Sequence, residues 1–143
     1  MGKAVREHPT VQREDVTVVS KLWQTHHAPE HVPQALEHTL KNLGLDYVDA
    51  YLMHWPMAWK FRGFGFDQLL VCDESGDIPR VDIDFLDTWH AMEKLLEDGR
   101  VKTIGVSNFT IPMLERLLAN CSIPPAINEI EVHPSHPNTE IVE

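Results

Sequence analysis

The chain has little of what metal centres, membrane spans and nucleic-acid surfaces require. Its 143 residues include two cysteines, Cys72 and Cys121, which are far apart and lack the spacing of metal ligands. No apolar run approaches the ~20 residues that cross a bilayer, and no apolar signal core follows the N-terminus. Lysine and arginine number 12 against 22 acidic residues, and the net charge of -10 repels phosphate backbones and anionic lipids. We therefore expect a cytoplasmic protein with reduced thiols that binds neither nucleic acid nor membranes.

The seven glycines form no Gly-x-Gly-x-x-Gly motif, but the apolar residues follow a clear order. Short apolar runs rich in β-branched residues predict four buried strands, at 16–22, 47–54, 101–108 and 125–132. Apolar spacings of three and four predict three helices, one ending at Gly44, one starting from an Asp84 N-cap and one opened near Pro112. The opening segment 2–8 is typical of the end of another helix.

Strands that alternate with helices predict βαβ units in a parallel sheet. A complete (β/α)8 barrel needs about 250 residues. The fold class we expect is therefore α/β, a partial (β/α)8 TIM barrel of about four parallel strands. A small doubly wound sheet is the alternative, and the missing glycine motif counts against its dinucleotide-binding form. The stretch 57–81 lacks periodicity but holds four aromatic residues, so we expect a long loop that packs on the protein or faces a substrate.

Polar side chains stand at the ends of all the predicted strands. Lys21 closes the first, His54 the second, Ser107 and Asn108 the third, and Glu129 lies on the fourth. The carboxyl ends of parallel strands meet at one face, which is where barrel enzymes hold their reacting groups. Taken singly, a strand-end lysine is usually solvated and a lone histidine is usually structural. The same feature on every strand favours a functional site.

The chemistry open to this set is limited. His54 could donate a hydrogen bond to a substrate carbonyl. Lys21 could lower the pKa of a neighbouring acid or form a Schiff base. Ser107 and Asn108 offer a hydroxyl and an amide that could orient a planar polar ligand such as a carboxamide.

Aromatic residues and further histidines lie close to these strand ends. Trp23 and Trp55 could form an apolar wall for a substrate. Two groups of histidines also follow strands, namely His26, His27 and His31 after the first and His133 and His136 after the fourth. Neither group has a cysteine partner or a helical pair of histidines, so we expect no metal site. We interpret them as loop histidines at the mouth of the barrel.

Four stretches carry a family resemblance: VVSKLW, YLMHWP, DTWHAMEKLLEDGRVKTIGVSNF and INEIEVHP. Together they resemble the aldo-keto reductase family, in the same order and over nearly the whole chain, with the weakest match across 57–81. The resemblance implies one incomplete barrel domain over residues 1–143. It also implies an oxidoreductase that binds NADPH and reduces aldehydes and ketones to alcohols by hydride transfer, while a tyrosine protonates the oxygen.

The resemblance implies roles for seven residues: the catalytic Lys21 and His54, the cofactor-binding Ser107, Asn108 and Glu129, and the substrate-binding Trp23 and Trp55. The lysine would tune the pKa of the tyrosine, the histidine would orient the carbonyl, and the serine and asparagine would hold the nicotinamide carboxamide. Glu129 departs from the family, which usually has glutamine here. An ionised carboxylate accepts from the carboxamide NH2 group but cannot donate to its oxygen.

The family's catalytic tyrosine and its partner aspartate belong to a strand and helix upstream of this stretch, so we expect the chain alone to be inactive. Neither Tyr47 nor Tyr51 matches the tyrosine motif. Two other interpretations stay open, a truncated non-catalytic binding or interaction remnant and a Schiff-base aldolase that uses Lys21. Four strands also leave two unpaired sheet edges, from which we expect self-association.

Overall fold

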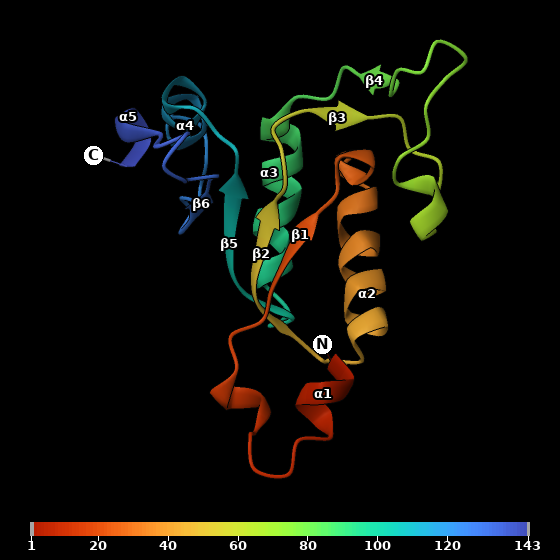
Figure 1. The fold of residues 1–143 in the computed structure, drawn as a ribbon, viewed down its shortest axis with the longest axis vertical. Helices are drawn as coiled ribbons and strands as arrows, with labels where there is room; N and C mark the ends of the chain where they lie inside the picture. The colour runs from red at the N-terminus through yellow and green to blue at the C-terminus, as the bar shows by residue number, and fades with distance from the viewer. Residues whose placement is uncertain (1, 143) are drawn as a thin grey trace.

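The computed structural model describes residues 2–142 and contains one parallel sheet of four strands. The strands are β1 (Val19–Leu22), β2 (Val48–Met53), β5 (Val101–Ser107) and β6 (Asn128–Glu129), in the order β1-β2-β5-β6. All adjacent pairs are parallel, so the carboxyl ends lie at one end of the molecule, toward which the arrows of β1, β2 and β5 point in Figure 1. The predicted α/β class, with parallel strands alternating with helices, is confirmed.

Two strands are shorter than the sequence predicts. The first begins at Val19 rather than at residue 16, because Val16 N–H donates to Arg13 O and closes the 3-10 turn η1 (Arg13–Asp15). The fourth covers only Asn128–Glu129 of the predicted 125–132, and it stops at Glu129 because β5, its one neighbour, ends at Ser107. A strand needs a partner for its ladder hydrogen bonds, so the chain beyond the end of β5 cannot continue the sheet.

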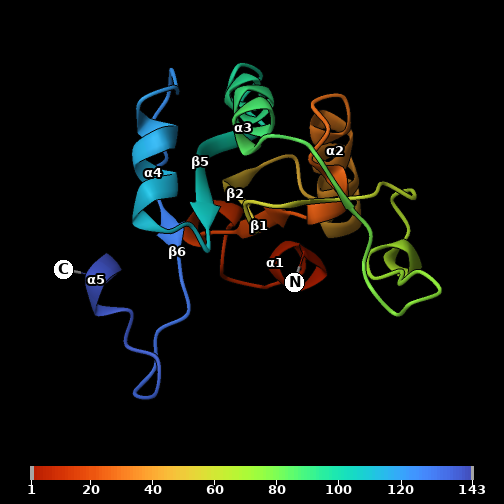
Figure 2. The ribbon, with the colours of Figure 1, turned by 90° about the horizontal axis from the view of Figure 1, so that it is seen from above.

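Three helices cover one face of the sheet, and Figure 2 shows them in an arc beside the strands. They are α2 (His31–Leu43), α3 (Phe85–Glu93), which continues into the 3-10 turn η4 (Lys94–Leu96), and α4 (Ile111–Leu118). The predicted caps are present: Gly44 takes a left-handed φ of 62° after α2, and the Asp84 carboxylate accepts from Leu86 N at 2.9 Å. Two short helices, α1 (Gly2–Arg6) and α5 (Thr139–Val142), lie near the chain ends. No helix within residues 2–142 is long and apolar enough to cross a membrane.

Side chains alternate along each strand between a helix-facing core and the inner face of the curled sheet. Leu22, Met53 and Val106 share a register row, are fully buried and belong to the core between sheet and helices. The helices supply Leu36, Trp89, Met92 and Leu117 to the same core. The neighbouring row, in which Lys21 pairs with Leu52, therefore faces the inner side. This alternation directs the predicted site residues away from the core and into the concave side of the sheet.

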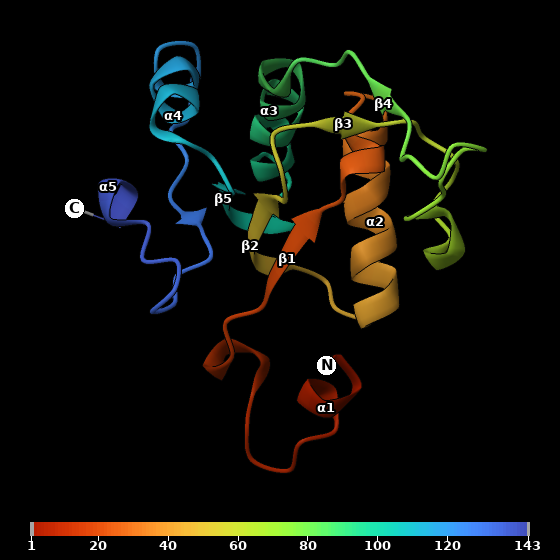
Figure 3. The ribbon, with the colours of Figure 1, turned by 45° about the horizontal axis from the view of Figure 1, so that its top comes forward.

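The stretch 57–81 packs on the protein, which is one of the two alternatives that the sequence left open. It contains the short antiparallel strands β3 (Ala58–Trp59) and β4 (Arg80–Val81) and the 3-10 turn η3 (Phe66–Gln68), as Figure 3 shows. Phe61 stacks on His31 with ring centroids 3.8 Å apart, and Phe64 stacks on His26 and His38 at 4.9 and 4.5 Å.

This packing corrects one expectation about the histidines. His26, in the 3-10 turn η2 (Gln24–His26), and the adjacent His27 are buried rather than open at the mouth of a barrel. The reason is that β3 lies against η2 and the aromatic rings of the following loop cover His26. A pattern of loop residues in the sequence does not reveal that another loop lies over them.

Candidate active site

The structure brings the five polar residues predicted at the strand ends into one connected group. His54 follows β2, Ser107 and Asn108 stand at the end of β5, Lys21 lies on the edge strand β1 and Glu129 on the opposite edge strand β6. Hydrogen bonds join the middle of the group, and an ion pair joins its two edges. The parallel direction of the strands explains the gathering, because each residue stands at or near the carboxyl end of its strand.

Asn108 connects the central strands of this group. Its φ of 62° is left-handed, a conformation that asparagine tolerates better than most residues. From there Nδ2 donates to His54 O at 2.9 Å and to Ser107 Oγ at 3.1 Å. Both amide hydrogens are therefore in use, and Oδ1 remains an acceptor without a partner among residues 2–142.

Ser107 and the backbone of Glu129 form a second fixed part. The Ser107 hydroxyl donates to Glu129 O at 2.8 Å, and Asn108 N–H donates to the same carbonyl at 3.0 Å. Because the hydroxyl hydrogen is already used, Ser107 can offer a ligand only an oxygen acceptor. These two bonds also anchor β6 beside β5, although β6 is only 2 residues long.

The His54 imidazole lies beside this group against the Trp23 indole, with ring centroids 4.9 Å apart and planes at 60°. His54 Nδ1 is buried without a hydrogen-bond partner, which leaves Nε2 as the ring atom able to meet a ligand. Burial lowers the pKa of His54, the Lys21 ammonium lowers it further, and the Glu129 carboxylate acts in the opposite direction. The ring is therefore uncharged at neutral pH, with one nitrogen that donates and one that accepts.

Lys21 and Glu129 form an ion pair that the sequence did not predict. Lys21 Nζ lies 2.7 Å from Glu129 Oε1, and the side chains are 29% and 49% exposed. The residues stand on opposite edges of the sheet, so they meet only because the sheet curls. An ammonium held by a carboxylate has no lone pair free to attack a carbonyl, which counts against Schiff-base chemistry.

The two tryptophans of the predicted site differ in their surroundings. Trp23 is held in place, because its Nε1 donates to Leu69 O at 2.9 Å and its ring meets the Trp59 ring edge-on at 5.9 Å. Sequence reasoning assigned Trp59 only to the long loop and missed this contact. Trp55 is 38% exposed beside a hollow of about 200 Å³ that Asn108 also lines.

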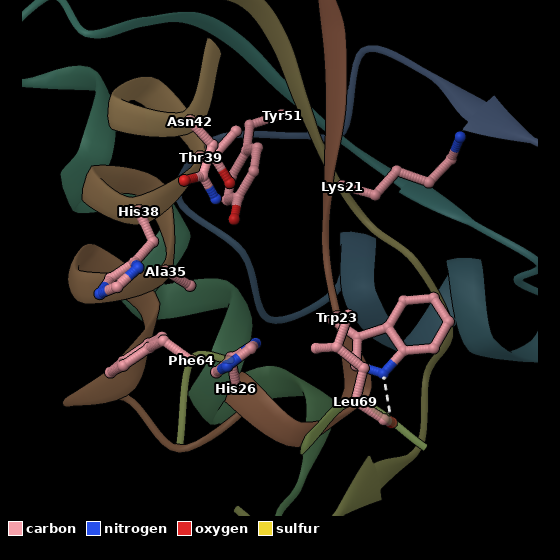
Figure 4. A pocket seen from close by; sticks show the side chains of 10 residues that line it. All are labelled: Lys21, Trp23, His26, Ala35, His38, Thr39, Asn42, Tyr51, Phe64 and Leu69. Carbon is pink, nitrogen blue, oxygen red and sulfur yellow. Dashed lines mark hydrogen bonds between the residues drawn. The ribbon is translucent and has the colours of Figure 1, made fainter. Parts of the chain in front are cut away.

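A separate cavity of about 200 Å³ lies between β1 and α2, and Figure 4 shows the side chains around it. His26, His38 and Phe64 line one side of it, and Tyr51 and Trp23 lie around the rest. The Lys21 side chain points away from the three rings. The ammonium of Lys21 is therefore directed to the strand ends and not into this cavity.

The polar atoms left unused at the strand ends are the donors and acceptors that a carboxamide needs. Asn108 Oδ1 and the second oxygen of Glu129 can accept from its NH2 group, and Lys21 Nζ keeps hydrogens for its carbonyl oxygen. The nicotinamide group of NAD(P)H carries such a carboxamide, so the residues present fit this cofactor. In the part of the chain that the structure describes, no group of three or more histidine, cysteine or acidic side chains could hold a metal ion.

The chain is similar to known oxidoreductases over its whole length. An uncharacterized oxidoreductase of Schizosaccharomyces pombe is 46% identical over 143 residues, which are 100% of this chain and 43% of that protein. The NAD(P)H-dependent D-xylose reductase of Kluyveromyces lactis is 41% identical over 140 residues, 94% of this chain and 42% of that protein. The structure of the aldose reductase from Schistosoma japonicum matches with a TM-score of 0.92 at 42% identity, covering 99% of this chain and 46% of that chain.

This chain therefore spans less than half the length of the relatives it matches. The structural match confirms the predicted fold, a portion of a TIM barrel. The sequence model of the aldo/keto reductase family matches residues 1–143. That match confirms the resemblance carried by the motifs: the chain belongs to the aldo/keto reductase family, which reduces aldehydes and ketones with NAD(P)H.

Proposed function

We propose that this chain forms the carbonyl-orienting and cofactor-binding part of an NADPH-dependent reductase of small aldehydes or ketones. The observation that carries the proposal is the Asn108 amide, whose bonds of 2.9 and 3.1 Å to His54 O and Ser107 Oγ hold both residues at one site. The residues proposed to act are Lys21 and His54 in catalysis, Ser107, Asn108 and Glu129 in cofactor binding, and Trp23 and Trp55 in substrate binding.

His54 orients the substrate carbonyl. A neutral imidazole donates one hydrogen bond, and Nε2 is the atom that can give it to a carbonyl oxygen. The bond becomes stronger as negative charge develops on that oxygen, so it stabilises the transition state more than the substrate. Bound NADPH supplies the hydride for the carbonyl carbon. Trp23, fixed against His54, and Trp55 supply apolar walls for the substrate.

The reduced oxygen also needs a proton, and neither tyrosine of this chain lies beside His54. Tyr51 is buried in the core between the sheet and the helices. Tyr47 precedes β2, at the other end of that strand, with the Arg13 guanidinium 3.9 Å from its ring centre. A general acid contributes roughly 10²–10⁴-fold to the rate, so we expect residues 2–142 alone to be nearly inactive and to retain only a slow residual turnover. Lys21 would lower the pKa of an acid placed next to it, because its positive charge favours the ionised form.

The first test separates cofactor binding from carbonyl orientation. NADPH binding is measured by quenching of tryptophan fluorescence in the wild-type chain, in Asn108→Ala and in His54→Ala. We expect Asn108→Ala to weaken binding by about tenfold, because it removes two hydrogen bonds and an acceptor from the site. His54→Ala removes only the imidazole, since Asn108 bonds the His54 backbone carbonyl, and NADPH affinity should change by less than about twofold.

The second readout is the rate of aldehyde-dependent oxidation of NADPH. His54→Ala is expected to reduce it by about a hundredfold, since the lost hydrogen bond acts in the transition state. Asn120→Ala is the matched control, because the Asn120 amide donates to Arg116 O at 2.8 Å after α4 and contacts none of the proposed site. Loss of NADPH binding in His54→Ala, or equal weakening in Asn108→Ala and Asn120→Ala, contradicts the proposal.

A further inference from the structure

We infer that Glu129 makes this chain favour the oxidised cofactor, NADP⁺, over NADPH, compared with a glutamine at the same position. The inference rests on the proposed function, since it needs the cofactor carboxamide to lie at Ser107, Asn108 and Glu129. It assigns Glu129 a role that an uncharged glutamine at the same position would lack, namely discrimination between the two redox forms of the cofactor.

Glu129 is held at the site through both its backbone and its side chain. Its backbone carbonyl accepts from Ser107 Oγ and Asn108 N at 2.8 and 3.0 Å, which fixes the residue beside both. Its side chain extends along the inner face to Lys21, where Oε1 lies 2.7 Å from Nζ. A carboxamide whose NH2 group donates to Asn108 Oδ1 and to the second oxygen of Glu129 has this carboxylate as its direct partner.

Lys21 is the charge that opposes Glu129 at this site. His54 is uncharged at neutral pH, and the next acid along the chain, Glu131, contacts His133 at 2.9 Å instead. Both members of the Lys21–Glu129 ion pair are partly exposed, at 29% and 49%, and water screens the attraction within such a pair. The ammonium therefore reduces the field of the carboxylate without removing it.

The two forms of the cofactor respond differently to this charge. The nicotinamide ring carries one positive charge when oxidised and none when reduced, and the carboxamide is bonded directly to that ring. A carboxylate in contact with the carboxamide attracts the charged ring of NADP⁺ and has little effect on the uncharged ring of NADPH. A glutamine would contact the same amide without making this distinction.

The test is the ratio of the dissociation constant for NADPH to that for NADP⁺, measured by titration calorimetry on the full chain. In Glu129→Gln we expect the ratio to fall by about threefold or more, because the substitution keeps the shape of the side chain and removes its charge. In Lys21→Met the ratio should rise, because the carboxylate loses its opposing charge. Glu131→Gln neutralises a carboxylate outside the site and is the matched control, with no change in the ratio.

An unchanged ratio in Glu129→Gln, with both cofactor forms bound, overturns the inference and leaves the proposed function in place. A ratio that falls in Lys21→Met overturns it as well, and this variant decides the question if circular dichroism shows that Glu129→Gln does not fold. Absence of binding of either form by the wild-type chain overturns the proposed function, and the inference with it.

Discussion

Among the single residues, His27 is buried with no partner for its ring. The side chain is fully buried, and neither Nδ1 nor Nε2 makes a hydrogen bond within residues 2–142. Burial lowers the pKa of His27 to about 4, with a further contribution from His26. The His27 carbonyl accepts from the Thr88 hydroxyl at 2.8 Å, which ties the position to α3. A protonated ring would therefore be a buried charge without a counter-ion.

Acid should destabilise the protein between pH 6.5 and about 4. In this window the unfolded chain binds a proton at His27 and the folded chain does not, so the free energy of unfolding decreases as the pH falls, by about 3 kcal/mol in total. Urea unfolding at several pH values across this window measures the change. His27→Leu should remove this part of the pH dependence, and His136→Leu, at an exposed position, should not. Identical pH dependence in wild type and His27→Leu would refute this assignment.

Among the elements, the stretch 57–81 is held against the rest of the protein by side-chain contacts, because its strands β3 and β4 pair only with each other. The rings of Phe61 and Phe64 stack on histidines of η2 and α2, and Trp23 Nε1 donates to Leu69 O at 2.9 Å. Because the Trp23 ring also contacts His54 at 4.9 Å, one side chain joins this stretch to the proposed active site. If the stretch 57–81 moves, Trp23 should move with it and change the position of the His54 ring.

Trp23→Phe tests how much that hydrogen bond contributes. The substitution removes the indole N–H but keeps an aromatic ring, so the stretch should open more often, and trypsin cleavage after Arg62 should become about fivefold faster. Trp59→Phe is the control, because the Trp59 indole N–H makes no hydrogen bond within the described residues. Equal cleavage rates in Trp23→Phe and Trp59→Phe would show that the bond to Leu69 does not restrain the stretch.

Helix ends were easier to predict from the sequence than strand ends. Gly44 and Asp84 end and begin helices through their own backbone conformation and side chain, so a short local pattern is enough. The end of β6 depends on where β5 stops, and β5 is separated from it by the whole of α4. The predicted strand 125–132 extended too far at its carboxyl end because its partner, and not its own composition, sets where it stops.

For the whole molecule, the sheet has two open edges and an inner face that none of the three long helices covers (Figure 2). Val19 on β1 is 41% exposed, which adds apolar surface at one edge. Lys21 and Glu129 add charge on the two edge strands, a feature that weakens pairing between edges. The apolar surface favours association and the charges oppose it, so self-association stays a prediction.

We expect the chain to self-associate reversibly, because association would cover an unpaired strand edge and apolar surface. Light scattering over a range of protein concentrations measures the mass of the particle. Val19→Lys should lower that mass by placing a charge on the edge strand. Val142→Lys, at a 63% exposed position on α5, should leave it unchanged. A particle with the mass of one chain at every concentration would contradict this prediction.

The sequence by itself determined the alternation of strands and helices, the helix caps, the family and the set of polar residues at the strand ends. These features depend on spacing and short motifs, which are local properties of the chain. Only the tertiary structure decided that Lys21 pairs with Glu129 and that the Asn108 amide donates hydrogen bonds to His54 O and Ser107 Oγ. The first contact depends on the curl that brings the two edge strands together, and the bond from Asn108 to His54 depends on the pairing of β5 with β2. The paired strands come from distant parts of the chain, so no local pattern specifies either contact.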